Sequence, residues 1–182
     1  EPELITRVKA GKLDFALVEN AMPDADMDSV TLGYDVLMFC APDRPPYSTA
    51  TQPVGIRTLL EWPMIIYEWN SGRHMVGNRH FRERYGISLN DHNLVARFDT
   101  HEAMLNGVKA GLGWACVPRC VAVNHRLDPG LLWFTVDTDP MRYPVSLVWE
   151  RDHAIPTLSL KFREFITENI PAGYFRDDGG RF

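Results

Sequence analysis

The residues best suited to binding a ligand follow an apolar run at residues 63–67, where a helix is predicted to begin. Asn70, Ser71 and Gly72 open this helix. A hydroxyl and the free N–H groups of a first helical turn can together hold a carboxylate or another anion, because the positive end of the helix dipole lies there. The same residues would also serve as an ordinary helix cap without a ligand. The pattern therefore predicts an anion site at this turn, with a plain cap as the alternative.

A second turn of the same kind follows the next apolar run, at residues 94–98. Thr100 is the predicted cap of a helix over residues 102–110, and His101 stands at its start. Ligands of open α/β sheets collect beyond the carboxyl ends of the strands, which is where both turns would lie. His101 could pair with an anion, although an exposed histidine in a first turn needs no such role. We therefore expect Thr100 and His101 to belong to the same ligand site.

Two further side chains are expected to contribute to this site. Tyr67 ends the run before the first turn and, with Trp69 and Trp114, could line an aromatic wall, although aromatic residues at strand ends are usually core. Glu19 follows another apolar run, at residues 13–18, and faces either the site or the solvent.

No arrangement typical of an enzyme or a metal site occurs in the sequence. The six histidines form no HExxH motif and no metal-spaced pair with cysteine, and neither a GxSxG elbow nor a Walker loop is present. Cys40, Cys116 and Cys120 lack the spacing of a zinc site or a disulfide framework. A redox pair of Cys116 and Cys120 is the weaker reading, because a thiol in an apolar run is usually inert. We expect no catalytic residue, metal or cofactor.

Composition narrows the class of protein. The chain has 182 residues, 45% of them hydrophobic and 24% charged, which is typical of a soluble globular protein. Its net charge of −5 argues against a large nucleic-acid surface, since phosphate binding depends on clustered Lys and Arg. No apolar stretch approaches the roughly 18–20 residues that cross a bilayer, and no secretory signal opens the chain. A cytoplasmic protein without membrane contact is predicted.

A repeated tetrapeptide indicates two parts of similar build. Val-Lys-Ala-Gly occurs at residues 8–11 and 108–111, each time after a helical pattern and before an apolar run. Gly11 and Gly111 are therefore predicted to end their helices in the left-handed conformation, with Lys9 and Lys109 near the negative helix ends.

The remaining patterns complete an alternation of strands and helices. Such alternation predicts an α/β fold with a parallel sheet, right-handed crossovers and helices on both faces. The closing helix, over residues 158–170, is amphipathic, with its apolar side chains on one face: Leu158, Phe162, Phe165 and Ile166. The other predicted strands span residues 13–18, 30–41, 63–67, 94–98, 114–117, 131–135 and 143–150, and the other helices residues 3–10, 56–60, 70–86 and 102–110.

In order and spacing, these segments resemble the effector-binding domain of LysR-type transcriptional regulators. The most specific is Val-x-x-Gly-Leu-Gly-x-x-x-x-Pro, within residues 102–118. The others are residues 8–18, 37–42 and 68–81, and 143–151 with the helix from 158. The resemblance implies an α/β, two-lobe, periplasmic-binding-protein-like (type 2) fold with two crossover strands, at residues 30–41 and 143–151, and an effector cleft between the lobes.

The resemblance also implies a division of the chain. Residues 1–40 would form part of lobe one, residues 41–142 lobe two, residues 143–170 the return strand and closing helix of lobe one, and residues 171–182 a flexible tail. In the family, a strand, a helix and a second strand normally precede the segment that opens this sequence. We therefore expect lobe one to be incomplete, so that this piece alone neither binds DNA nor binds effector at full strength.

The function implied is the sensing of a small, anionic metabolite that modulates DNA binding by a winged helix-turn-helix domain absent from this sequence. The family commonly assembles through its effector domains, so a homodimer or homotetramer is expected. A solute-binding receptor for uptake is the alternative, since it uses the same fold. An enzyme on a related scaffold is the third reading and the weakest, because no catalytic residues stand out.

Overall fold

The computed structural model describes residues 2–20, 24–67, 72–89, 92–151 and 155–170. These residues divide into two compact units, each of which is described by itself. Unit 1 contains the described residues up to Asp35 and from Arg142 onward, and unit 2 contains Val36–Met141. In the described part of the chain, no helix is both long enough and apolar enough to cross a membrane.

Most helices and strands lie where the sequence pattern predicts them. The helices are α1 (Pro2–Lys9), α2 (Ile56–Glu61), α3 (Gly72–Tyr85), α4 (His101–Lys109), α5 (Arg119–Ala122) and α6 (Thr157–Glu168), with a 3-10 turn at Tyr47–Thr49. The strands are β1 (Ala16–Glu19), β2 (Met27–Pro42), β3 (Met64–Tyr67), β4 (Leu94–Phe98), β5 (Ala115–Pro118), β6 (Leu131–Phe134) and β7 (Arg142–Glu150). Helix α5 was not predicted, because four residues are too few to show a helical period.

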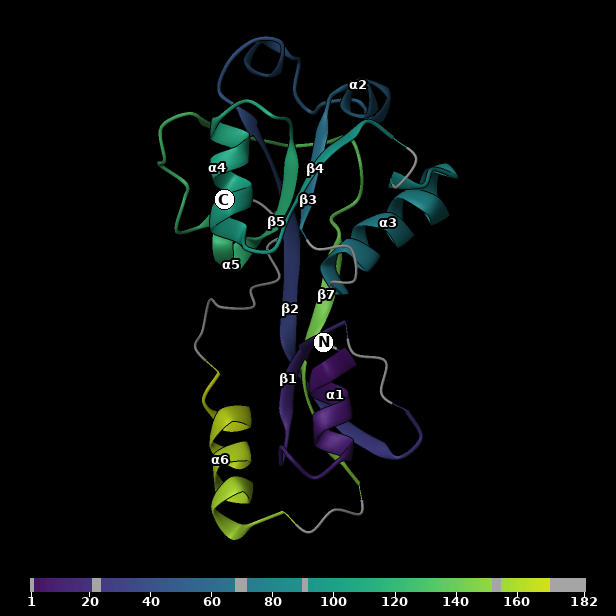
Figure 1. The fold of residues 1–182 in the computed structure, drawn as a ribbon, viewed down its shortest axis with the longest axis vertical. Helices are drawn as coiled ribbons and strands as arrows, with labels where there is room; N and C mark the ends of the chain where they lie inside the picture. Colours follow the sequence, from purple (N-terminus) through teal and green to yellow (C-terminus); the bar gives the residue numbers. More distant parts are fainter. Residues whose placement is uncertain (1, 21–23, 68–71, 90–91, 152–154, 171–182) are drawn as a thin grey trace. The chain divides into compact units, whose positions relative to one another are not determined.

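Unit 2 has strands between two helices. Strands β3 and β4 pair in parallel, as the alternation predicts, and β3 meets the start of β5 through a parallel bridge between Met64 and Trp114. Helices α4 and α3 lie on opposite sides of these strands (Figure 1). The parallel arrangement does not extend to β2, because β5 and β6 both run antiparallel to it.

The core of unit 2 lies beneath α4. Met104, Leu105 and Val108 are fully buried against Ile65 and the strands around it. Two glycines allow this close packing. A Cβ at Gly107 would lie 2.8 Å from the ring of Phe98, and a Cβ at Gly113 would lie 2.1 Å from the carbonyl oxygen of Pro63. Ordinary Cβ contacts are longer than 3.4 Å, so Gly113 in particular cannot carry a side chain without backbone movement.

Unit 1 is built from α1, β1, β7, the first half of β2, and α6. Strand β1 pairs with β7 in antiparallel register and is the edge strand of the order β1, β7, β2. Helix α1 packs against them through Val8, which is 1% exposed. Helix α6 contacts the residue that precedes β1, because the rings of Phe162 and Phe15 are stacked. None of the residues of α6 is buried. Its predicted apolar face is therefore largely in contact with solvent.

The two Val-Lys-Ala-Gly segments have matching backbone geometry. Gly11 and Gly111 are left-handed, with φ of 64° and 89°, as predicted. In both copies the glycine N–H donates to the valine carbonyl, and the next N–H donates to the carbonyl five residues back, Arg7 or Gly107. This pair of hydrogen bonds is the Schellman motif, which satisfies carbonyls at a helix end that would otherwise have no partner.

Candidate functional site

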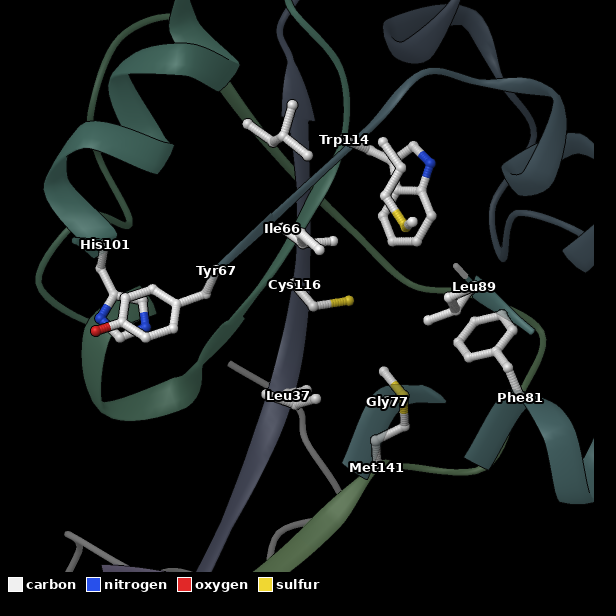
Figure 2. A pocket seen from close by; sticks show the side chains of 12 residues that line it. Leu37, Ile66, Tyr67, Gly77, Phe81, Leu89, His101, Trp114, Cys116 and Met141 are labelled. Atoms are coloured by element: carbon white, nitrogen blue, oxygen red, sulfur yellow. The ribbon is translucent and has the colours of Figure 1, made fainter. Parts of the chain in front are cut away.

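A pocket opens in unit 2 between α3 and the strands β2, β3 and β5 (Figure 2). Its volume is about 40 Å³, against the ~10–15 Å³ that a single water molecule requires. The space is therefore large enough for a small group of atoms. It is lined by Leu37, Met64, Ile65, Ile66, Tyr67, Gly77, Phe81, Leu89, His101, Trp114, Cys116 and Met141.

Two hydrogen-bonding side chains, those of Tyr67 and His101, lie together at one end of the pocket. The rings of Tyr67 and His101 are stacked, with centroids 4.5 Å apart and planes 13° from parallel. Tyr67 ends β3 and His101 begins α4, so the parallel pairing of β3 with β4 brings these residues together. Figure 2 shows both rings on the side of the pocket opposite Phe81 and Leu89. A phenol and an imidazole at the start of a helix can offer hydrogen bonds to an anion or to a neutral polar group.

Thr100 stands directly before His101 and is the N-cap of α4. Its backbone is extended, with φ −131° and ψ 148°, and its hydroxyl oxygen accepts a hydrogen bond from the Ala103 N–H at 3.2 Å. The predicted cap is thus confirmed. A hydroxyl that accepts one hydrogen bond can still donate its own proton, so the capping role is compatible with ligand contact.

The other predicted site residues are distributed differently. Gly72 is the first residue of α3, while Asn70 and Ser71 lie outside the described residues. Glu19 ends β1 and belongs to unit 1, whereas Tyr67, Thr100 and His101 belong to unit 2. The structure therefore brings Tyr67 and His101 together, with Thr100 adjoining them. Trp114, considered for an aromatic wall, lines the same pocket.

Sequence reasoning missed most of the apolar lining, because pocket residues such as Leu37, Phe81 and Met141 look like ordinary core. One signal was available. Gly77 lies inside a helix, where glycine costs about 0.5–1 kcal/mol relative to alanine, so its presence needs a reason. A Cβ there would meet only the side-chain tips of Leu89 and Leu37, at 3.8 and 3.9 Å. No backbone crowding requires this glycine.

Two thiols of unit 2, those of Cys40 and Cys116, have raised pKa values and are therefore neutral at physiological pH. Burial raises the pKa of Cys40 to about 12. Burial also raises the pKa of Cys116, which lines the pocket, well above its usual range. Phe39 pairs with Cys116 and Cys40 pairs with Ala115, so the two thiols lie on opposite faces of the paired strands and cannot form a disulfide. Across the described residues, no cluster of His, Cys, Asp or Glu could hold a metal ion.

Comparison with known families gives one match over nearly the whole chain. The family described as the LysR substrate binding domain matches residues 1–171. An uncharacterized HTH-type transcriptional regulator of Mycobacterium tuberculosis is 23% identical over 145 residues, which are 80% of this chain and 46% of that protein. A regulator of Mycobacterium bovis matches equally well. The chain thus spans about half the length of these curated relatives.

Solved structures share the fold at low sequence identity. The effector binding domain of QuiR, solved in complex with shikimate, has a TM-score of 0.77 and 16% identity, and the match covers 91% of this chain and 76% of QuiR's. The regulatory domain of CcmR from Synechocystis PCC6803, solved in complex with 2-PG, has a TM-score of 0.74 and 16% identity, covering 93% of this chain and 81% of CcmR's.

Proposed function

The chain belongs to the LysR substrate-binding domain family, and on that premise we propose that it is the effector-sensing domain of a LysR-type transcriptional regulator. The observation that carries the proposal is the stacked pair of Tyr67 and His101 at one end of a mostly apolar pocket. Such a pocket, with few convergent polar groups, is the usual form of a small-molecule site.

The polar end of the effector would bind at the start of α4. Thr100 and His101 stand where the N–H groups and the positive end of the helix dipole favour an anion, and Tyr67 adds a hydroxyl beside them. We therefore propose a small anionic metabolite as the effector. Shikimate and 2-PG, bound to the related QuiR and CcmR domains, support a small molecule of this size class.

The response would be a shift of population between two conformations of the regulator. A ligand that binds one conformation more tightly than the other changes their ratio, and a separate DNA-binding part of the full-length protein would report the change. The helix-turn-helix regulators among the relatives support this role over solute uptake. The same role implies a cytoplasmic protein, and we propose a homodimer or homotetramer because paired DNA-binding domains read paired half-sites.

The test uses the full-length protein and DNA from upstream of its own gene. Fluorescence anisotropy of the labelled DNA would be measured with and without a panel of small carboxylates. One or more carboxylates should change the affinity, and His101→Ala should reduce that change at least tenfold while leaving ligand-free DNA binding intact. Arg57→Ala, on the exposed face of α2, is the matched control and should behave like the unmodified protein. DNA binding that no metabolite alters would refute the proposal.

A further inference from the structure

Among the described residues, the inner part of the unit 2 pocket offers no partner for a charged group. Apart from Tyr67 and His101, the described lining side chains are aliphatic, aromatic or sulfur-containing. Burial keeps the Cys116 thiol in its neutral form. Moving a carboxylate or an ammonium group into such a space without a partner is strongly unfavourable. These described side chains therefore favour a group that is uncharged and mostly apolar beyond Tyr67 and His101.

Gly77 keeps this space open. It is buried in the middle of α3, yet nothing crowds its missing side chain: the nearest atoms to a Cβ would be Leu89 Cδ1 at 3.8 Å and Leu37 Cδ1 at 3.9 Å. Both are ordinary van der Waals distances, so alanine would fit. A longer side chain at this position would extend into the pocket, because Gly77, Leu37 and Leu89 all line it (Figure 2).

The side chains of Tyr67 and His101 lie together at one end of the pocket, whereas the indole Nε1 of Trp114, another lining residue, is buried without a hydrogen-bond partner among the described residues. In Figure 2, Tyr67 and His101 occupy one side, and Leu37, Cys116, Met141, Leu89 and Phe81 surround the remainder. A ligand with a polar head and an apolar body could match both parts at once. A ligand with polar groups all around would leave several of them without hydrogen-bond partners in the apolar part, which costs binding free energy.

We propose that the effector carries a small uncharged apolar group, either a short branched alkyl chain or a single ring, and that this group enters the unit 2 pocket while the polar head stays beside Tyr67 and His101. The inference rests on the proposed function, since it specifies the ligand of the same site. The volume of about 40 Å³ sets the size: the group is larger than water and no larger than a few carbon atoms or one ring.

Three carboxylates with the same head and different bodies provide the probe: propanoate, isovalerate and phenylacetate. Each would be titrated into the ¹⁵N-labelled full-length protein by NMR, with calorimetry at two temperatures. Each buried methylene should tighten binding about fourfold, so isovalerate and phenylacetate should bind about tenfold or more tightly than propanoate. The heat-capacity change should become more negative along the series, because apolar surface leaves water.

Variants that fill the pocket should remove this gain. Gly77→Leu fills it from α3 and should leave all three carboxylates with the affinity of propanoate. Gly77→Ala is the matched control and should retain the gain. Cys116→Leu fills the same space from β5 and provides a second test if Gly77→Leu does not fold. Equal affinities along the series in the unmodified protein, or a gain that persists in both filled variants, would overturn the inference.

The outcome is separable from that of the proposed function. If polar dicarboxylates control DNA binding but apolar bodies give no gain in affinity, effector sensing stands and the pocket assignment is wrong. If isovalerate or phenylacetate enters the pocket but no metabolite alters DNA binding, the pocket assignment stands and the regulatory role is wrong. The absence of binding by all three probes overturns the pocket assignment.

Discussion

Each unit contains a helix that ends in Val-Lys-Ala-Gly and leads into a strand, yet the two settings differ. In both, valine is buried, glycine is left-handed, and lysine pairs with an aspartate: Lys9 with Asp24 and Lys109 with Asp128. The second copy also has Gly107 and Gly113, where the first has Arg7 and Leu13.

Those two positions determine how closely neighbouring elements approach. Gly113 lets the chain pass against the Pro63 carbonyl, and Gly107 lets α4 lie on Phe98. In unit 1, Arg7 is exposed and Leu13 is half-buried, and β1 remains an edge strand with Leu17 54% exposed. The Val-Lys-Ala-Gly motif therefore fixes how the helix ends. The additional glycines, Gly107 and Gly113, allow neighbouring elements to pack closely against the second copy.

The largest difference in stability effect between the two copies is expected for substitutions at residue 113 and at its counterpart, residue 13. We expect Gly113→Ala to lower the free energy of unfolding by about 3 kcal/mol or more, because the new Cβ would meet backbone rather than a mobile side chain. The nearby hydrogen bond from Trp114 N–H to the Pro63 carbonyl, 2.9 Å long, would be disturbed as well. Urea unfolding followed by tryptophan fluorescence measures the change. Leu13→Ala, at the matching position, should cost about 1 kcal/mol; equal losses would contradict the comparison.

The next largest difference in stability effect is expected between substitutions in the two amphipathic helices, α4 and α6. Leu105 in α4 is fully buried, so Leu105→Ala should cost about 2–5 kcal/mol. Phe162 in α6 is 52% exposed, and Phe162→Ala should change stability by no more than about 0.5–1 kcal/mol. Thermal unfolding by circular dichroism would compare them. A loss at Phe162 as large as that at Leu105 would mean that α6 packs more tightly than the structure indicates.

The two left-handed glycines should behave alike. Gly11→Ala and Gly111→Ala each place a Cβ at positive φ, which costs about 1–2 kcal/mol. The Cβ at position 111 would also meet Arg44, but through the tip of a flexible side chain that can move away. Chemical denaturation of both variants should therefore give losses within about 1 kcal/mol of each other.

The smallest effect on stability is expected at the aspartate that pairs with the lysine, and this effect should depend on pH. The hydrogen bond from Lys109, followed by that from His125, lowers the pKa of the Asp128 carboxyl. Since the folded pKa lies below the unfolded value of about 3.9, the stabilisation is complete above about pH 5 and is lost as the pH falls through the folded pKa. Asp128→Asn should thus lower the melting temperature at pH 7, and its effect should shrink as the pH falls below the unfolded pKa of about 3.9. A difference that is constant across this range would exclude the ion pair as its source.

Local signals explain why so much of the fold could be predicted. The Thr100 cap, the glycine helix ends and the β4 boundaries depend on neighbouring residues, which a sequence displays directly. The LysR family could be identified from the order of such segments. Antiparallel pairing of β5 with β2 depends on contacts between distant residues, so the alternation of elements did not predict it.

The candidate site was predictable only in part, for the same reason. The proximity of Tyr67 and His101 could be predicted, because the carboxyl ends of neighbouring parallel strands lie at the same edge of a sheet. The apolar lining comes from β2, α3, β5 and Met141, and its members have no pattern that separates a pocket wall from a core. Gly77 is the exception, since glycine is unfavourable in a helix interior. The reason for its presence can be found only in the residues that surround it.

The solvent-facing stripe on α6 has a practical consequence for anyone who purifies this chain. Leu158, Phe162 and Phe165 keep between half and four-fifths of their surface in water. Such a stripe is a site for unspecific self-association, and its effect grows with concentration. A low salt concentration, a low protein concentration and a cosolvent that wets apolar surface would therefore help to keep the preparation monodisperse.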